Sequence, residues 1–200
     1  VETDKIEIFY NASPSSFQSA SKVNLLKNIL LISNHPPQEL LEAIKILEKK
    51  NNIRVSHIGT RGRYERLQPS HIAENDAVIT IGKSVQYAIN GARAVYCYDH
   101  FGGPGWITLE NFKKSENTNF SGRCCHRKIS AEEIANEVVL NFEKANQDVF
   151  EIREILTDKY LIDRYIKSIF LARKQRKKHV IKLNKKDKYM IMVEAEFAKN

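Results

Sequence analysis

Residues 76–106 contain two short apolar runs, and each run is followed directly by a polar loop that contains glycine. The runs are residues 78–81 and 94–98, and the residues between them, 84–90, have the length of a short helix. Apolar runs of four to eight residues bounded by turn residues predict buried strands. A strand–helix–strand unit places its two strands parallel, so both carboxyl ends lie at the same edge of a sheet.

The same alternation of strand and helix patterns continues on either side of this unit. Strands are expected at residues 28–33, 53–58, 77–81 and 94–98, and helices at 38–50, 69–74, 84–90, 108–114 and 130–145. Ser130 and Glu133 have the spacing of a capping box at the start of the last helix. Alternating strands and helices predict an α/β fold, with a Rossmann-like parallel sheet flanked by helices on both faces and a C-terminal helical extension.

The pattern divides the chain into three parts. Residues 1–27 are expected to be an irregular segment or linker, with a short edge strand at 5–10, and residues 28–147 form the Rossmann-like domain. Residues 148–200 are expected to be a helical extension with a basic tail. Apolar side chains recur at three- and four-residue steps over 148–172, which predicts a helical pair or one kinked helix that contacts a partner domain or a second copy. The end of the chain fits a strand or a helix equally.

The net charge of +8 is concentrated near the C-terminus. Residues 173–188 hold nine of the 32 Lys and Arg residues and one of the 24 acidic residues, which leaves 23 of each sign elsewhere. The body is therefore not a basic protein. The basic segment is either a solvated charge run or a contact site for anionic lipid or nucleic acid. No run of 18 apolar residues occurs, and no N-terminal signal pattern is present.

The cysteines do not form a disulfide framework. There are three, and two of them, Cys124 and Cys125, are adjacent, which suits a reducing cytoplasm. Cys124, Cys125 and His126 are neighbours, but a zinc site needs four ligands and no second cluster follows, so no metal is expected.

The loop after residues 78–81 has phosphate-binding chemistry. Gly82-Lys83-Ser84 lies at a strand-to-helix junction, where free amides, the helix dipole and the Lys83 ammonium converge. The alternative is structural, with Gly82 permitting the turn and Ser84 capping the helix. The spacing of a Walker motif is absent, and so is GxGxxG.

The loop after residues 94–98 is rich in glycine. Gly102, Gly103 and Gly105 let backbone amides approach a ligand, while His100 supplies a titratable ring and Trp106 a stacking face. The alternative is a plain structural turn. His35, after the first strand, either faces the cleft or is a turn histidine bonded to backbone.

Several runs in residues 28–145 carry a family resemblance. The runs ITIGK…YA, YDHFGGPG and NFSGR, together with SNHPPQELLEAIKIL and VSHIGTRGRYERL, resemble the carboxyl-terminal, nucleotide-sugar-binding domain of bacterial GT-B-fold glycosyltransferases of surface or capsular polysaccharide synthesis. The resemblance is specific over residues 76–123 and loose elsewhere.

The resemblance implies a donor site at the strand ends. The diphosphate would contact the two glycine-containing loops, the nucleoside would lie near residues 59–64, and Arg123 of NFSGR would contact phosphate or carboxylate. The nucleotide-sugar-binding candidates are Gly82, Lys83, Ser84, Tyr87, His100, Gly102, Gly103, Gly105, Arg123 and Arg61.

The resemblance also implies partners. These are a nucleotide-sugar donor, a glycan or lipid-linked acceptor and a further N-terminal domain, without a metal or other cofactor. The apolar stripe of residues 148–172 adds a homodimer as the alternative to that domain, and the basic tail adds peripheral contact with the inner face of the membrane, with no specific nucleic acid as a partner. Many retaining members place a glutamate shortly after the Gly-Gly pair, where this chain has Pro104, Gly105 and Trp106, so the catalytic residues and the stereochemistry stay open. The alternative function is a non-catalytic nucleic-acid or protein interaction module that acts through the basic tail.

Overall fold

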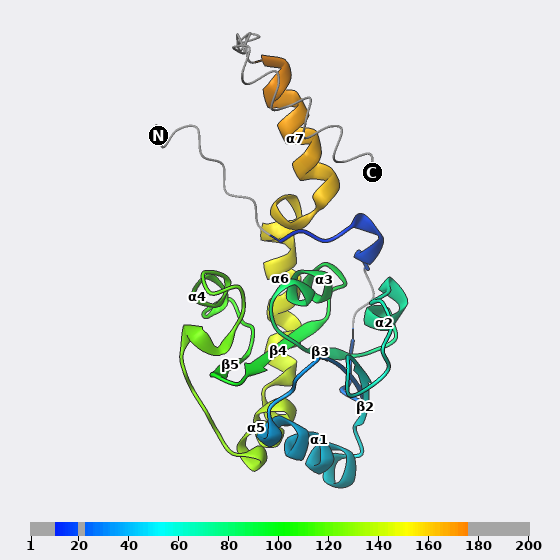
Figure 1. Cartoon of the computed structure of the whole chain (residues 1–200), viewed down its shortest axis with the longest axis vertical. Helices are drawn as coiled ribbons and strands as arrows, with labels where there is room; N and C mark the ends of the chain where they lie inside the picture. The colour runs from blue at the N-terminus through cyan, green and yellow to red at the C-terminus, as the bar shows by residue number, and fades with distance from the viewer. Residues whose placement is uncertain (1–10, 20–22, 176–200) are drawn as a thin grey trace, which may run out of the picture. The chain divides into compact units, whose positions relative to one another are not determined.

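The computed structural model describes residues 11–19 and 23–175 (Figure 1). Five strands form one sheet: β1 Asn28–Ile32, β2 Arg54–Ile58, β3 Ala77–Ile79, β4 Ala94–Asp99 and β5 Gly102–Trp106. Seven α-helices occur in the described residues: α1 Gln38–Asn51, α2 Pro69–Ala73, α3 Lys83–Asn90, α4 Phe112–Glu116, α5 Ala131–Leu140, α6 Phe142–Tyr160 and α7 Ile162–Gln175. Two 3₁₀ turns, η2 Ser15–Phe17 and η3 Gly122–Cys124, complete the described structure.

The sheet has the strand order β2-β1-β3-β4-β5. Strands β1 to β4 are parallel, and β5 alone is antiparallel to its neighbour β4. The chain leaves β1 in one direction through α1 to β2, and then crosses back to β3 on the other side of β1. The fold is the expected α/β fold, a Rossmann-like and mostly parallel sheet with helices on both faces and a C-terminal helix.

Helices cover the sheet on both faces because strand residues alternate between two apolar clusters. Side chains such as Ile29 and Tyr96 pack with α1 and α5, whereas Leu30 and Val95 pack with α2, α3 and the middle of α6. All of these side chains are fully buried, and strands buried on both faces are typical of parallel sheets. Figure 1 shows the helices distributed around the sheet in this way.

Helix α6 is longer than the sequence pattern predicts and crosses the expected boundary at residue 148. Its first turn, with Phe142, belongs to one apolar cluster, and Val149 and Ile152 belong to the other. These parts of the apolar stripe are therefore buried against the chain's own sheet and helices, while Ile155 and Ile169 are exposed. The chain divides into two compact units, Val1–Ile166 and Lys167–Asn200.

The glycine-rich segment after β4 differs from the expectation. It was expected to form a loop, but Gly102–Trp106 forms strand β5, with Gly105 paired to Cys97 and Trp106 to Tyr96. The expected helix at 108–114 begins only at Phe112. The reason is that the Asn111 side chain bonds the Thr108 amide (3.0 Å) and the Trp106 carbonyl (2.8 Å), which forms a turn first. The expected strand at 5–10 and the segment 176–200 lie outside the described residues.

A polar cluster fastens β5 and the chain after η3 to α5. The Arg127 guanidinium donates two hydrogen bonds to the Glu137 carboxylate, at 2.6 and 2.8 Å, and the Tyr96 hydroxyl donates a third at 2.9 Å. The Trp106 indole donates to the Glu137 carbonyl (3.1 Å), and its ring packs edge-on against Tyr96 and beside Phe142. These contacts keep the antiparallel edge strand in place.

Candidate functional site

A crevice of about 500 Å³ opens at the carboxyl ends of the four parallel strands. The residues that line it come from these strands, from the loops that follow them and from the helix starts: Leu31, Ile32, Ser33, Asn34, His35, Pro37, Leu40, Ile58, Gly59, Tyr64, Glu65, Leu67, Ile79, Thr80, Ile81, Ser84, Tyr98, Asp99 and His100. The chain reverses its direction across the sheet between β1 and β3. Open α/β sheets bind ligands outside the carboxyl ends of the strands at such a switch point.

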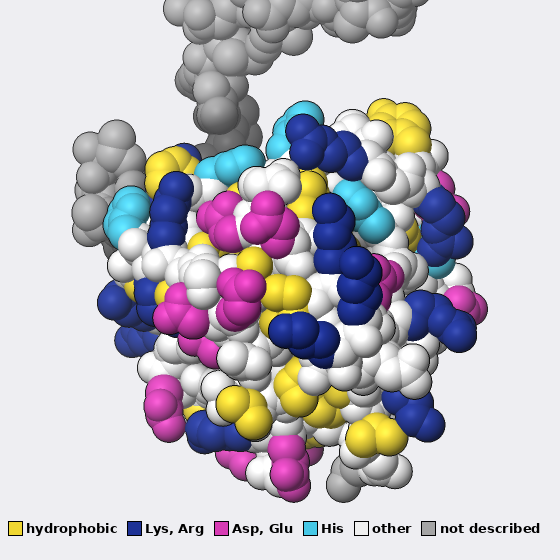
Figure 2. Space-filling model, turned by 90° about the horizontal axis from the view of Figure 1, so that it is seen from below, with side chains coloured by type: hydrophobic (Ala, Val, Ile, Leu, Met, Phe, Trp, Pro, Cys, Tyr) yellow, Lys and Arg dark blue, Asp and Glu magenta, His cyan; other side chains and the backbone are white. Residues whose placement is uncertain are grey.

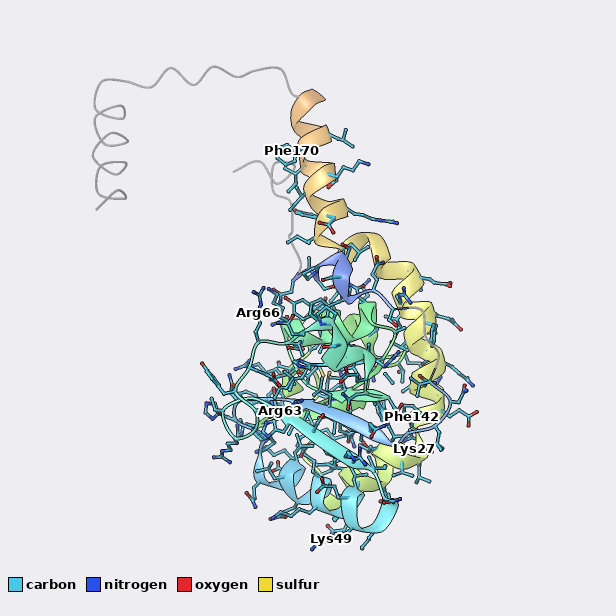
Figure 3. All side chains as sticks on the ribbon, turned by 90° about the vertical axis from the view of Figure 1, so that its right-hand side faces the viewer. Lys27, Lys49, Arg63, Arg66, Phe142 and Phe170 are labelled. Carbon is cyan, nitrogen blue, oxygen red and sulfur yellow. The ribbon has the colours of Figure 1, made fainter. Side chains whose placement is uncertain are left out.

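Figure 3 shows the direction of the strands. Lys27, just before β1, and Arg63, just after β2, lie at opposite ends of the sheet, and Arg66 lies toward the Arg63 end. The crevice is at the Arg63 end, because its lining residues follow the strands rather than precede them.

A larger hollow, of about 720 Å³, lies at the opposite end of the sheet. It is lined by residues such as Lys27, Asn28, Asn52 and Arg54, and it faces the C-terminal end of α1. Carbonyl groups and the negative end of the helix dipole face that hollow, which disfavours an anionic ligand. The crevice at the carboxyl ends has the opposite polarity, since helices begin there.

Hydrogen bonds between neighbouring loops fix the wall of the crevice formed by β1 and β2. The His57 ring lies 2.7 Å from the Ser33 carbonyl, and the Thr60 hydroxyl donates to the Asn34 carbonyl at 2.6 Å. Gly59 allows this close approach, because a Cβ there would lie 2.0 Å from the Ser33 oxygen. The backbone carbonyls of Ser33 and Asn34 are therefore fixed by the side chains of His57 and Thr60.

The floor of the crevice between β1 and β3 is apolar except for Thr80. This side chain is only 3 % exposed, and its hydroxyl donates to the Ile32 carbonyl at 3.0 Å. Thr80 thereby ties the end of β1 to the end of β3. The bond fixes the two strand ends that form the switch point.

Helix α3 begins at the rim of the crevice without a side-chain cap. Gly82 precedes it with φ 63° and ψ −139°, and no side chain bonds the first amides of the helix. Since the first-turn amides of a helix lack intrahelical acceptors, they are available to a ligand. Ser84 lines the crevice, and the exposed Lys83 ammonium lies 5.5 Å from the Tyr87 ring centroid. Tyr87 in turn stacks on Phe17, with ring centroids 4.5 Å apart.

The end of β4 contributes His100 and Asp99 to the crevice. His100 is exposed, whereas Asp99 is mostly buried and accepts hydrogen bonds from the Phe101 amide (2.7 Å) and the Gly122 amide (3.0 Å). Both Asp99 oxygens therefore hold the turn and η3 in place. The Arg123 guanidinium lies over the Phe101 ring at 4.3 Å, in cation–π contact, and is exposed.

The structure brings together only some of the ten predicted site residues. Ser84 and His100 line the crevice, and Gly82 and Lys83 stand at its rim as the start of α3. Arg61 is exposed in the turn after β2 but does not line the crevice, and Tyr87 faces Phe17.

The three glycines after β4 have structural roles, and they are not among the residues that line the crevice. The Gly103 amide donates to the Arg127 carbonyl at 3.0 Å, and Gly105 lies in the β4–β5 ladder. A Cβ at Gly102 would lie 2.0 Å from the Arg127 oxygen, and a Cβ at Gly103 would lie 2.0 Å from the Cys97 oxygen. At Gly102 and Gly103, glycine is required because other backbone passes so close, whereas the nearest atoms at Gly105 belong to the side chains of Glu137 and Arg127.

Tyr64 and Glu65 line the crevice. Tyr64 ends the segment 59–64 at which the resemblance places the nucleoside, whereas Glu65 was not among the predicted site residues. The chain turns back after β2, where Gly59 N donates to the Arg63 carbonyl (3.0 Å) and Arg63 N to the His57 carbonyl (2.9 Å). This return places the two following side chains at the crevice. The sequence signal for this return of the chain was Gly62, a turn residue between Arg61 and Arg63.

The described residues contain no group of three or more His, Cys, Asp or Glu side chains arranged to hold a metal ion. Cys125 is exposed and Cys124 half-buried, with their sulfurs 3.6 Å apart, and Cys97 is buried. Burial raises the pKa of the Cys97 thiol well above its ordinary value. None of the described helices combines the length and the apolar character needed to cross a lipid bilayer.

Fold and crevice together define a Rossmann-like α/β protein with an open crevice at the topological switch point. No protein-family model matches the chain, and comparisons with curated proteins and with solved structures find no match.

Proposed function

We propose that this chain binds a nucleotide-diphosphate sugar in the switch-point crevice and forms the donor-binding part of a glycosyltransferase that acts on a cell-surface glycan or lipid-linked acceptor. The observation that carries the proposal is the crevice itself. It has the volume of a small-molecule site, opens at the carboxyl ends of β1 to β4, and has the uncapped start of α3 at its rim.

Charge favours an anionic group at this rim. The first amides of α3 and the positive end of the helix dipole lie there, Lys83 is exposed in the first turn of the helix, and His35 and His100 line the crevice. In the proposed reaction, the departing diphosphate gains negative charge, and these groups stabilise it. Arg123, exposed beside Phe101, is a further cation for the same group.

The proposed setting is cytoplasmic, at the inner face of the membrane. Three free cysteines suit a reducing compartment, and the basic residues of 173–188 would attract anionic headgroups near lipid-linked acceptors. The exposed side chains of α6 and α7, such as Ile155 and Ile169, are where a further domain or a second copy would contact the chain.

Calorimetry with UDP-, GDP-, CDP- and TDP-sugars tests the proposal. We expect one or more of these donors to bind, and we expect Lys83→Gln to weaken that binding about tenfold because an ammonium–phosphate contact is lost. The matched control is Lys49→Gln, which removes the same charge from an exposed residue in the last turn of α1, at the opposite end of the sheet (Figure 3).

The control variant should bind the donor as the unchanged protein does. A folded protein that binds none of the four donor classes contradicts the proposal. If Lys83→Gln and Lys49→Gln weaken donor binding equally, binding depends only on the overall charge of the protein. The start of α3 is then not part of the binding site.

A further inference from the structure

Two thiols lie side by side in the turn that follows η3. Cys124 and Cys125 are adjacent in the sequence, and their sulfurs lie 3.6 Å apart. Cys125 is exposed and Cys124 is half-buried, so one member of the pair meets dissolved reagents directly. The third cysteine, Cys97, is fully buried in β4, out of reach of such reagents. The adjacent thiols are therefore the pair that is placed to react together with an oxidant.

A disulfide between these two residues would add little to the stability of the fold. It would close the shortest possible loop, and the stabilisation by a disulfide grows with the length of the loop that it closes. Consecutive Cα atoms lie about 3.8 Å apart, below the spacing of about 4.4–6.8 Å that is usual for bridged cysteines, so the ring is strained. Strained and exposed disulfides are reduced easily and are the labile or regulatory ones. The chemistry that fits the pair is therefore reversible oxidation.

The surroundings give the two sulfurs different roles. Oxidation by peroxide begins at an accessible thiolate, and Cys125 is the exposed member of the pair. Burial, and then the contact with Cys125, raise the pKa of the Cys124 thiol above its ordinary value of 9.0. Cys124 therefore stays protonated while Cys125 reacts first. A sulfenic acid at Cys125 then has a second sulfur beside it, which is the arrangement of a resolving cysteine.

Backbone hydrogen bonds to Gly122 hold the turn that carries the pair. The Gly122 carbonyl accepts from Cys125 N (3.2 Å) and from His126 N (2.8 Å), and the Gly122 amide donates to Asp99 (3.0 Å). A disulfide needs the sulfurs to approach to about 2.0 Å, and the short Cα spacing forces part of that change onto the backbone dihedral angles. Oxidation therefore loosens the turn. Because Asp99 lines the crevice, the change begins beside that site.

We propose that Cys124 and Cys125 form a redox-modification site, at which a peroxide oxidises the two thiols to a disulfide and a small cellular thiol such as glutathione reduces it again. The inference goes beyond the proposed function and does not depend on a nucleotide.

The oxidation has two steps. The Cys125 thiolate attacks one oxygen of hydrogen peroxide, the O–O bond breaks, and the hydroxide that leaves is neutralised by the proton that Cys125 released. The Cys124 sulfur then attacks the sulfenic sulfur of Cys125, the S–O bond breaks, and the leaving hydroxide takes the Cys124 proton. Two thiols and one hydrogen peroxide thus give one disulfide and two waters. In the reverse direction, two glutathione thiols restore the dithiol and leave as glutathione disulfide.

The test is treatment of the full chain with hydrogen peroxide, removal of the peroxide by catalase, and a count of the free thiols after denaturation. We expect the count to fall by two, from three to one. The mass of the protein should fall by two hydrogen atoms, without added oxygen, and a peptide that contains both cysteines should carry the bond. Incubation with glutathione should restore all three thiols.

Single substitutions assign the two roles. In Cys124→Ser, we expect no disulfide within the chain and a Cys125 sulfenic acid that a cyclic 1,3-diketone such as dimedone traps. In Cys125→Ser, the half-buried Cys124 should react with peroxide about tenfold more slowly, because access to its sulfur is restricted. The matched control is Cys97→Ala, which keeps the pair and should still lose two thiols. Circular dichroism and urea unfolding check that each variant is folded.

Hydrogen exchange measures the effect on the turn. In the oxidised protein, we expect the amides of Cys125 and His126 to exchange about tenfold faster, because their bonds to the Gly122 carbonyl are weakened. The original rates should return when glutathione reduces the disulfide. Cys124→Ser treated with peroxide is the control, since it is exposed to the same oxidant but forms no ring.

Three results would overturn the proposal. They are sulfinic or sulfonic acid as the main product at Cys125, a disulfide that joins two chains or includes Cys97, and a disulfide that glutathione does not reduce. If a reversible disulfide forms and the exchange rates stay the same, the modification site stands and its effect on the turn is wrong. None of these measurements uses a nucleotide donor, so their outcome is independent of the proposed function.

Discussion

At the residue scale, Glu137 is the centre of a polar cluster that joins α5 to the sheet. It accepts hydrogen bonds from Arg127 and from the Tyr96 hydroxyl, and Tyr96 is fully buried in the sheet. Burial, and then the neighbouring Glu137 carboxylate, raise the pKa of Tyr96 above its ordinary value of 10. The folded protein therefore keeps this phenol protonated at a pH where the unfolded chain releases its proton.

We predict that alkaline pH destabilises the fold through Tyr96. The contribution is fully present below pH 10, and above it the free energy of unfolding falls by about 1.4 kcal/mol per pH unit, because only the unfolded state ionises. Urea unfolding between pH 9 and 11 measures this slope, and Tyr96→Phe should make it shallower. The control Tyr64→Phe, at a side chain 87 % exposed, should keep the original slope. An unchanged slope in Tyr96→Phe would contradict the prediction.

Residues that directly follow a predicted strand could be assigned to the crevice from sequence. Ser84 and His100 lie within a few residues of the ends of β3 and β4, so the parallel topology alone places them at the crevice. Tyr64 and Glu65 follow β2 by six and seven residues, and only the return of the chain through Arg63 brings them back. That return depends on long-range backbone pairing, which local sequence patterns do not reveal.

At the element scale, the structure corrects the expected conformation of the glycine-rich segment, which is strand β5 and not a loop. Gly102 and Gly103 are required there because neighbouring backbone lies close, as the Cys97 carbonyl does to Gly103. The parallel strands were predictable because continuous apolar runs require burial on both faces. The antiparallel strand was not, because its sequence, GGPGW, has neither apolar alternation nor β-branched residues.

Two glycine substitutions should separate close packing from backbone strain. In Gly103→Ala, the new Cβ would lie 2.0 Å from the Cys97 oxygen, and we expect unfolding to become easier by about 3 kcal/mol or more. In Gly82→Ala, the Cβ meets nothing closer than Asn119 at 3.6 Å, so the cost is the strain of a positive φ, about 1–3 kcal/mol.

Urea unfolding of both variants gives the comparison. A larger loss in Gly82→Ala than in Gly103→Ala would mean that β5 can shift away from β4 and that the edge strand is not fixed. The same measurements provide the stability reference for the binding variants at Lys83.

At the scale of the whole molecule, α6 belongs to the main fold. Val149 and Ile152 are 2 % exposed and pack with the cluster that contains α3. The start of the described chain joins the same region, since Ser13 N donates to the Tyr160 carbonyl at 2.8 Å and Ile162 N to the Ser13 carbonyl at 3.1 Å. Removal of α6 would expose one face of the sheet.

We therefore predict different outcomes for two truncations. A chain that ends at residue 147 should not unfold cooperatively, because its apolar cluster is incomplete, whereas a chain that ends at residue 172 should unfold as the full chain does. Urea unfolding followed by circular dichroism measures both. A cooperative transition of the shorter chain at the midpoint of the full chain would show that α6 adds nothing to the fold.

The longer truncation also removes the source of the net charge. Deletion of residues 173–200 leaves 22 basic and 21 acidic residues, and both kinds occur across the face shown in Figure 2. Nucleotide binding by the truncated chain at the affinity of the full chain would separate the crevice from the basic tail. Polyanion binding by the full chain that depends steeply on salt and is lost on truncation would instead support the nucleic-acid alternative.

Trp106 is the single tryptophan of the sequence, and it is 5 % exposed at the junction of β5, α5 and α6. The protein therefore has one buried tryptophan fluorophore, and it does not line the crevice. Its emission reports whether the edge of the sheet remains intact, so a shift of its spectrum in any variant reveals damage to the scaffold rather than loss of a ligand contact.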